Sequence, residues 1–117
     1  MNMPDRSGVV RLTEAQASIP GPAGERAVVV LRRGALDVAF ALPVPPSQQT
    51  PHAQDEMYVI VRGRGVLVHD GKRDSFESGD LLLVAAGCEH QFEDVSDDLA
   101  LWRVFYGPSG GEVPEPP

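Results

Sequence analysis

The sequence predicts an all-β domain, either a sandwich or a closed barrel, and two observations lead to this class. Residues that interrupt regular structure are dense, with 12 glycines and 11 prolines among 117 residues. Between them lie short runs that are β-branched or that alternate between apolar and polar side chains, and no run has the length or the 3.6-residue period of a long helix. Many short strands joined by regularly spaced turns are typical of sandwiches and barrels.

The expected strands follow one another along the whole chain. They are Val9–Leu12, Ala27–Leu31, Leu36–Leu42, Met57–Val61, Val66–His69, Leu81–Val84, Gln91–Val95 and Leu99–Tyr106. A single helical turn is expected over Thr13–Ser18.

The turns between these strands have recognisable sequences. Asp70-Gly71 predicts a type I′ hairpin that leads into a further strand over Lys72–Phe76. Gly34 ends a second turn, and the prolines of Pro43–Pro51 predict a loop. Residues 108–117 are rich in Pro, Gly and Glu, so we expect a tail that is disordered or draped over the surface.

Length and composition exclude several classes of protein. One domain spanning residues 1–117 is expected, and the single cysteine, Cys88, allows no internal disulfide. No apolar run approaches a membrane span and the N-terminus lacks the pattern of a secretion signal, so a cytoplasmic location is the default expectation. A net charge of −7 argues against nucleic-acid binding, although one buried arginine can still bind a carboxylate locally.

Three side chains of the types that metal ions prefer lie within one part of the sequence. His52 and Glu56 lie where the proline-rich loop becomes a strand, and His90 begins a later strand. Strands that are distant in sequence become neighbours in a rolled sheet, so two imidazoles and a carboxylate can converge on one divalent ion. The alternative interpretation is that both histidines make ordinary hydrogen bonds at the surface or in the core. Glu56 opens an apolar strand, where an unpaired carboxylate is costly to bury.

The same segment resembles the first motif of the cupin family. That motif is His-x-His, three or four residues, Glu, six residues and Gly. Here Thr50-Pro51-His52 is followed by Glu56 and by Gly63 at the motif spacing, with Thr50 in place of the first histidine.

The second cupin motif also has a counterpart. It is Gly, five residues, Pro-x-Gly, two residues, His, three residues and Asn. Here it reads Gly79, Ala85-Ala86-Gly87, His90 and Asp94, so that Pro is replaced by Ala85 and Asn by Asp94.

The resemblance implies a small double-stranded β-helix, or jelly-roll, barrel with a motif core at about residues 43–106. It also implies one divalent transition metal (Fe, Mn, Ni or Zn) with three protein ligands, His52, Glu56 and His90. Gln48 or Thr50 could supply an oxygen in place of the missing histidine. Because histidine binds metal only when it is neutral, metal affinity should fall below a pH of about 6.5.

Strand alternation indicates which side chains line the cavity beside this metal. If Glu56 points inward, so do Tyr58 and Ile60; if His90 does, so does Phe92. On the last strand either Trp102, Val104 and Tyr106 or Leu101, Arg103 and Phe105 point inward, and the second register would place a guanidinium where it can hold a carboxylate. The expected pocket residues are Thr50, Tyr58, Ile60, Cys88, Phe92 and Arg103.

Three functions follow from these expectations. The first is a metalloenzyme, of dioxygenase, isomerase or lyase type, acting on a small organic acid or a sugar-like molecule. The second is a non-catalytic cupin that binds or senses a small ligand, and the third is a structural subunit. A homodimer is expected under all three, because the edges of a small β-domain need covering.

Overall fold

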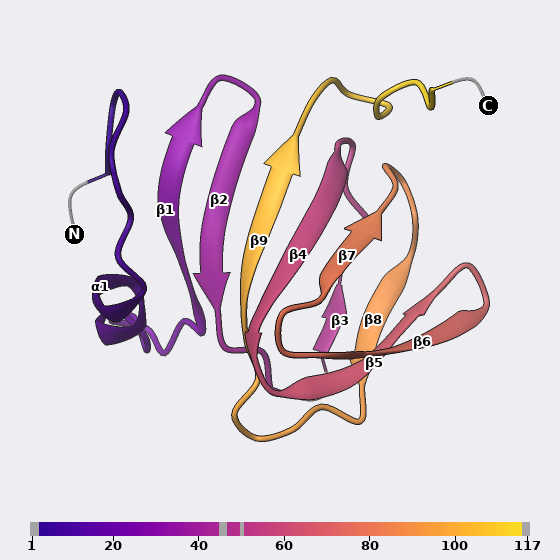
Figure 1. Cartoon of the computed structure of the whole chain (residues 1–117), viewed down its shortest axis with the longest axis horizontal. Helices are drawn as coiled ribbons and strands as arrows, with labels where there is room; N and C mark the ends of the chain where they lie inside the picture. The colour runs from indigo at the N-terminus through magenta and orange to yellow at the C-terminus, as the bar shows by residue number, and fades with distance from the viewer. Residues whose placement is uncertain (1–2, 45–46, 50, 116–117) are drawn as a thin grey trace.

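The computed structural model describes residues 3–44, 47–49 and 51–115, and nearly all of its regular structure is β-strand (Figure 1). One short helix, α1 (Leu12–Ala17), precedes the strands. The strands are β1 (Ala27–Arg33), β2 (Leu36–Ala41), β3 (Ser47–Gln49), β4 (Asp55–Arg62), β5 (Arg64–His69), β6 (Lys72–Glu77), β7 (Leu81–Val84), β8 (His90–Glu93) and β9 (Ala100–Tyr106). No helix in the described ranges is long and apolar enough to cross a membrane.

The strands form two antiparallel sheets that pack face to face as a jelly-roll barrel. The five-stranded sheet has the order β1-β2-β9-β4-β7, and the four-stranded sheet has the order β3-β8-β5-β6. Figure 1 shows the chain passing from β4 directly into β5, and this tight bend is one of the connections between the two sheets. The all-β barrel expected from the sequence is therefore confirmed.

The hydrophobic core between the sheets comes from every second residue of the inward-facing strands, as the pleat of a strand requires. On β4 the pattern leaves Glu56, Tyr58 and Ile60 buried while Met57 and Val59 are half-buried. The core cluster consists of Tyr58, Ile60, Leu67, Phe76, Leu82, Val84, Phe92, Leu99 and Leu101.

A second apolar cluster lies on the outer face of the five-stranded sheet, where α1 covers it. Ala15 of α1 is fully buried with Val30 and Phe40, and Val10 and Leu12 pack against them. The strand expected over Val9–Leu12 is therefore wrong: these apolar residues are covered by packing on a sheet face and not by strand pairing. The loop expected over Pro43–Pro51 contains the short strand β3, which pairs with β8.

The bend between β4 and β5, which leads the chain from one sheet into the other, depends on Gly63. Its φ is +89°, a conformation that is costly for residues with a side chain, and an added Cβ would lie 2.8 Å from the backbone Cα of Leu99. The turn brings β4 and β5 into different sheets without a long loop, and this places the start of β4 opposite the start of β8.

The segment after β9 is attached to the start of β4. The carboxylate of Asp55 accepts hydrogen bonds from the backbone N–H groups of Glu112 at 2.8 Å and Ala86 at 3.0 Å. Gln54 donates a side-chain hydrogen bond to the carbonyl of Gly107 at 2.9 Å. Residues 107–112 therefore lie against the barrel, next to the loop that leads to β8.

Candidate functional site

A buried carboxylate, Glu56, lies at the beginning of β4. Its position opposite Phe105 on β9 and Val84 on β7 directs the side chain into the barrel, and the residue is only 1% exposed. Neither side-chain oxygen accepts a hydrogen bond within the described part of the chain. A buried carboxylate without donors is strongly disfavoured, so this position calls for a cation or a proton.

His90 is the nearest side chain to this carboxylate. It is the first residue of β8, it is 5% exposed, and its Nε2 lies 3.1 Å from Oε1 of Glu56. The Nε2–Oε1 contact is short but lacks the directionality of a hydrogen bond, which is why both oxygens remain without a donor. The hydroxyl of Tyr58, on the same face of β4 as Glu56, lies 3.0 Å from the same Nε2.

The loop before β8 determines which ring nitrogen of His90 carries the proton. Gly87, with φ of +77°, and the turn formed by the Cys88 N–H and the Ala85 carbonyl bring the carbonyl of Cys88 to 3.0 Å from Nδ1 of His90. A carbonyl only accepts, so Nδ1 carries the hydrogen and, in the neutral ring, Nε2 presents a lone pair.

This tautomer has a chemical consequence for the pair. In the neutral ring the Nε2 lone pair of His90 accepts the Tyr58 hydroxyl and faces a Glu56 oxygen that also can only accept. Two acceptors at this distance require a proton or a cation between them. The arrangement of Glu56 and His90 thus suits either a shared proton or a metal ion.

The pKa shifts of His90 and Tyr58 agree with this geometry. Burial lowers the pKa of His90, but the Glu56 carboxylate and the Cys88 carbonyl outweigh burial, and the net pKa lies above the ordinary histidine value. Burial, with the charge of Glu56 beside it, raises the pKa of Tyr58 well above that of a free phenol, so the hydroxyl keeps its proton.

His52, the third ligand expected from the sequence, occupies a different position. Its side chain is exposed and its ring lies on Phe105, with the ring centroids 4.3 Å apart. Its carbonyl accepts a hydrogen bond from the N–H of Gly87 at 2.8 Å, which joins the two motif segments through their backbones. Over residues 3–44, 47–49 and 51–115 no group of three or more His, Cys, Asp or Glu side chains is arranged to hold a metal ion. The three-ligand set stays a prediction.

The other expected pocket residues are distributed unevenly around this pair. Tyr58, Ile60 and Phe92 are buried between the sheets, and Cys88 is half-buried. Thr50 lies outside the described residues, as does the side chain of Gln48. Within this group, the hydroxyl of Tyr58 and the backbone carbonyl of Cys88 contact His90 directly.

The register of β9, which the sequence left open, directs Leu101, Arg103 and Phe105 inward. Arg103 is paired with Tyr58 across the β4–β9 ladder, while Trp102 packs on Phe40 in the outer cluster. The guanidinium of Arg103 lies 4.4 Å above the ring of Phe105 and donates a hydrogen bond to Asp37 at 3.2 Å. A cationic group therefore points into the barrel beside Tyr58.

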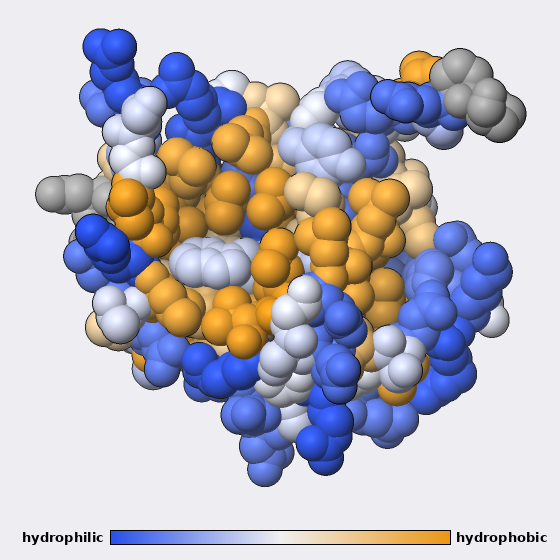
Figure 2. Space-filling model, viewed as in Figure 1, coloured by the Kyte–Doolittle hydropathy of each residue, from blue (hydrophilic) through white to orange (hydrophobic). Residues whose placement is uncertain are grey.

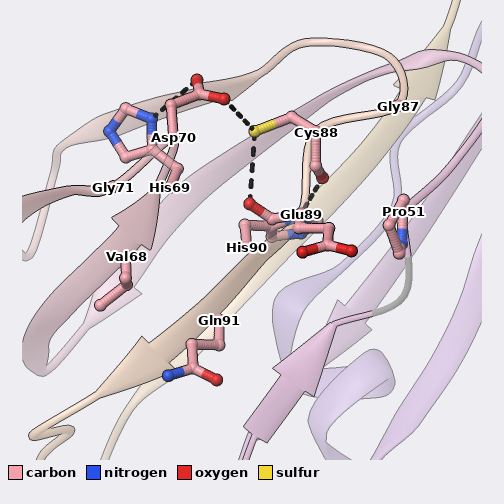
Figure 3. Close-up of a pocket in the computed structure, with 10 residues that line it drawn as sticks. All are labelled: Pro51, Val68, His69, Asp70, Gly71, Gly87, Cys88, Glu89, His90 and Gln91. Carbon is pink, nitrogen blue, oxygen red and sulfur yellow. Dashed lines mark hydrogen bonds and ion pairs between the residues drawn. The ribbon is translucent and has the colours of Figure 1, made fainter.

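Two cavities reach this set of residues. An open one of about 710 Å³ lies at the barrel mouth, where Figure 3 shows His90 below the Cys88 loop and next to the β5–β6 turn. Its lining is polar: the Cys88 thiol lies 3.3 Å from an Asp70 carboxylate oxygen, and burial is the main cause that raises the pKa of that thiol. A smaller cavity of about 200 Å³ is lined by both Tyr58 and Arg103.

Sequence reasoning missed several members of this region. His69, which the sequence did not mark as part of this region, is half-buried and its Nε2 lies 2.6 Å from the carboxylate of Asp74. The contact between Tyr58 and His90 and the presence of Arg26 in the smaller cavity were not anticipated. The Tyr58 contact could have been suspected from strand parity, whereas nothing in the sequence distinguishes Arg26 from the other surface arginines.

Comparison with known proteins agrees with the fold. The model of the Cupin domain family matches residues 43–106. An uncharacterized protein of Streptomyces coelicolor is 38% identical over 60 residues, which are 51% of this chain and 57% of that protein, so the match spans little more than half the length of this relative.

Solved structures resemble the chain more widely at lower identity. A Cupin 2 conserved barrel domain protein from Salinispora arenicola has a TM-score of 0.58 and 22% identity, covering 69% of this chain and 74% of that chain. A Neisseria meningitidis protein has a TM-score of 0.67 and 16% identity, covering 86% of this chain and 100% of its own. These structures support the fold, and because the Cupin domain model matches more than half of its residues, the chain belongs to the cupin family.

Proposed function

We propose that this cupin binds one divalent transition metal ion and is an enzyme that acts on a small organic acid or a sugar-like molecule. The observation that supports the proposal is the pair of buried Glu56 oxygens without a hydrogen-bond donor, next to Nε2 of His90. A carboxylate and a neutral imidazole are ligands for iron, manganese, nickel or zinc. His52 is the expected third ligand, because it lies four residues before Glu56 at the motif spacing and its backbone is joined to the loop that carries His90.

A bound metal would supply a Lewis acid or an oxygen-binding centre, as dioxygenase, isomerase and lyase reactions require. The chain's own groups have separate tasks. Glu56 and His90 would hold the ion, and the Cys88 carbonyl keeps the proton of His90 on Nδ1, so that Nε2 would be the ligand atom. The hydroxyl of Tyr58 keeps its proton and serves as a hydrogen-bond donor at the edge of the site.

Elemental analysis of protein purified without chelator tests the proposal. The wild-type chain is expected to contain about one equivalent of a transition metal, and Glu56→Gln and His90→Gln should each lose most of it. His69→Gln is the matched control, because His69 is a half-buried histidine on the neighbouring strand β5 that contacts Asp74. The proposal fails if wild-type protein takes up no metal, or if the control loses as much metal as the two ligand variants.

The metal content of His52→Gln tests the third ligand separately. The set of three predicts a clear loss of affinity for this variant, since removing one ligand of a divalent ion weakens binding strongly. Retention of full affinity would leave Glu56 and His90 as the ligands and would exclude His52.

A second function, binding of a small ligand without catalysis, is favoured by one observation. The pKa of Tyr58 is raised, so the hydroxyl beside His90 is a poor general base at neutral pH. A panel of small acids and sugars separates the two functions: an enzyme turns over at least one of them, and its Glu56→Gln variant loses turnover. A protein that only binds its ligand would bind members of the panel without converting any of them.

We further propose a cytoplasmic location and a homodimer. The only cysteine, Cys88, is free, which suits a reducing compartment. The exposed leucines Leu81 and Leu83, on the outer face of the five-stranded sheet, support pairing of two copies.

A further inference from the structure

The smaller cavity of the barrel has an unusual charge for this acidic chain. It has a volume of about 200 Å³, and two guanidinium groups, those of Arg26 and Arg103, contribute to its wall. Its other lining residues are Ala27, Ala41, Pro43, Tyr58, Phe92 and Leu101. No carboxylate belongs to this lining within the described ranges, although the chain has a net charge of −7. The cavity wall therefore carries two arginines and no carboxylate, and Arg103 is also paired with Asp37, which is not part of this wall.

Arg103 has hydrogen-bonding capacity that the protein does not use. A guanidinium carries five N–H donors in a planar fork. One of them, on Nη2, donates to Asp37 at 3.2 Å, while Nε is buried and has no acceptor among the described residues. The flat face of the group lies over the ring of Phe105, which holds the plane in position. An oriented, buried N–H without an acceptor suits a ligand that brings an oxygen.

Tyr58 connects this cavity with the Glu56–His90 pair. It is paired with Arg103 across the β4–β9 ladder, it lines the cavity, and its hydroxyl lies 3.0 Å from Nε2 of His90. A ligand held by Arg103 would thus lie next to the same hydroxyl that contacts His90. The remaining walls, from Phe92 and Leu101, suit a short apolar body.

From these contacts we infer that the cavity binds a small monocarboxylic acid, whose carboxylate is held by the fork of Arg103 and whose apolar chain lies against Tyr58 and Phe92. The inference rests on the proposed function in placing the acid beside Glu56 and His90, and it narrows the substrate class to carboxylates with a short apolar chain. A volume of about 200 Å³ is below the roughly 300 Å³ at which sites for drug-sized ligands begin, so the cavity suits an acid of a few carbons.

An NMR titration of the full chain with propionate tests the inference, with propionamide as the neutral probe of the same shape. Propionate should shift the signal of the Arg103 Nε–H group and bind at least about tenfold more tightly than propionamide, because a carboxylate forms charge-assisted hydrogen bonds with the fork. Arg103→Gln should weaken propionate binding by about tenfold or more. Arg103→Lys keeps the charge but loses the fork, so its affinity for propionate should lie between those of the wild type and of Arg103→Gln.

Arg32→Gln is the matched control for the arginine. Arg32 binds the same Asp37 carboxylate as Arg103, at 3.1 Å, but it is not part of the cavity wall. This variant should bind propionate as the wild type does. If Arg103→Gln does not fold, Arg103→Lys carries the test, and it should weaken the binding of propionate more than that of propionamide.

Equal binding of propionate and propionamide, or wild-type affinity in the folded Arg103 variants, overturns the inference. Repeating the titration after chelation separates it from the proposed function, because a carboxylate could also bind a metal directly. Binding that survives chelation and depends on Arg103 supports the inference even if elemental analysis finds no metal. Binding that requires metal and ignores Arg103 overturns the inference while the proposed function stands.

Discussion

At the scale of single residues, the most informative feature is a carboxylate that the fold buries at a cost. Glu56 is 1% exposed, neither of its oxygens accepts a hydrogen bond among the described residues, and its Oε1 lies 3.1 Å from Nε2 of His90. A neutral amide in its place avoids the burial of a charge and can donate to the lone pair of His90. Stability and ion binding are thus opposed at this position.

Glu56→Gln should therefore stabilise the metal-free protein while abolishing metal uptake. We expect a gain of about 1–2 kcal/mol in the free energy of unfolding in the presence of chelator, since a buried polar group without a partner costs about this much. Urea denaturation of both chelated proteins measures it. A less stable variant would mean that the carboxylate already has a stabilising partner and that the interpretation of Glu56 is wrong.

Asp55, the residue before Glu56, shows the opposite case of a buried carboxylate that is fully paired. Hydrogen bonds from the backbone N–H groups of Glu112 and Ala86 lower its pKa below the ordinary value for aspartate. One oxygen serves each donor, so the side chain ties residues 107–112 to the loop before β8.

The pH dependence of stability should reveal this contact. Because the pKa is lowered in the folded state, the contribution of Asp55 is present above a pH of about 4 and is lost as the pH falls through the lowered value. Asp55→Asn should therefore melt below the wild type at neutral pH, and the difference should shrink towards zero in acid. Melting temperatures of both proteins between pH 2 and 7 provide the measurement, and a difference that does not change with pH would contradict it.

At the scale of elements, two turns decide how the strands meet, and they differ in what surrounds them. Gly63 between β4 and β5 has φ of +89° and faces the backbone of Leu99, whereas Gly71 between β5 and β6 has φ of +74° and open space at its Cβ position. The sequence predicted the Asp70-Gly71 hairpin from its dipeptide, and the structure confirms β5 and β6 on its two sides.

Replacing each of these two glycines by alanine should separate the cost of the left-handed backbone conformation from the cost of a steric clash. Gly71→Ala should cost about 1–2 kcal/mol, the penalty of a left-handed conformation for a residue with a side chain. Gly63→Ala should cost more, about 2–5 kcal/mol, because its Cβ would also lie 2.8 Å from the Leu99 Cα and would push the bend between β4 and β5 away from Leu99. Urea denaturation of both variants measures the loss in the free energy of unfolding. Equal losses would show that the bend between β4 and β5 can shift to accommodate the methyl group without further cost.

At the scale of the whole molecule, one face of the barrel is unusually apolar. Figure 2 shows apolar residues gathered over the five-stranded sheet, beyond the area that α1 covers. Leu81 and Leu83 of the edge strand β7 are 62% and 60% exposed, and they lie opposite Val59 and Met57 of β4. An exposed apolar sheet face beside an unpaired edge favours association.

We expect two copies of the chain to pair through this face. Leu83→Asp should convert the protein to a monomer in sedimentation velocity, because an unpaired charge would be buried at the interface. Val113→Asp is the control: Val113 is 88% exposed but lies in the segment after β9, so the same substitution there should leave the association state unchanged. A wild-type chain that sediments as a monomer at all concentrations would refute the pairing.

The strand faces, the turns and the motif spacing could be predicted from the sequence, because they depend on neighbours along the chain. Alternation on β4 determined that Glu56, Tyr58 and Ile60 share a face, and the spacing of glycines and histidines indicated the barrel and the family. Local patterns misled at Val9–Leu12, where packing on the sheet face replaced strand pairing, and at Pro43–Pro51, where the prolines hid the short strand β3.

What only the tertiary structure decided are the contacts between strands that are distant in sequence. The register of β9, which turns Arg103 inward and Trp102 outward, depends on how β9 aligns between β2 and β4. The contact of Tyr58 with His90 and the position of His52 on Phe105 depend on how the two sheets face each other. A single sequence carries no local signal for such alignments, because the free energy that selects them comes from packing the whole core at once.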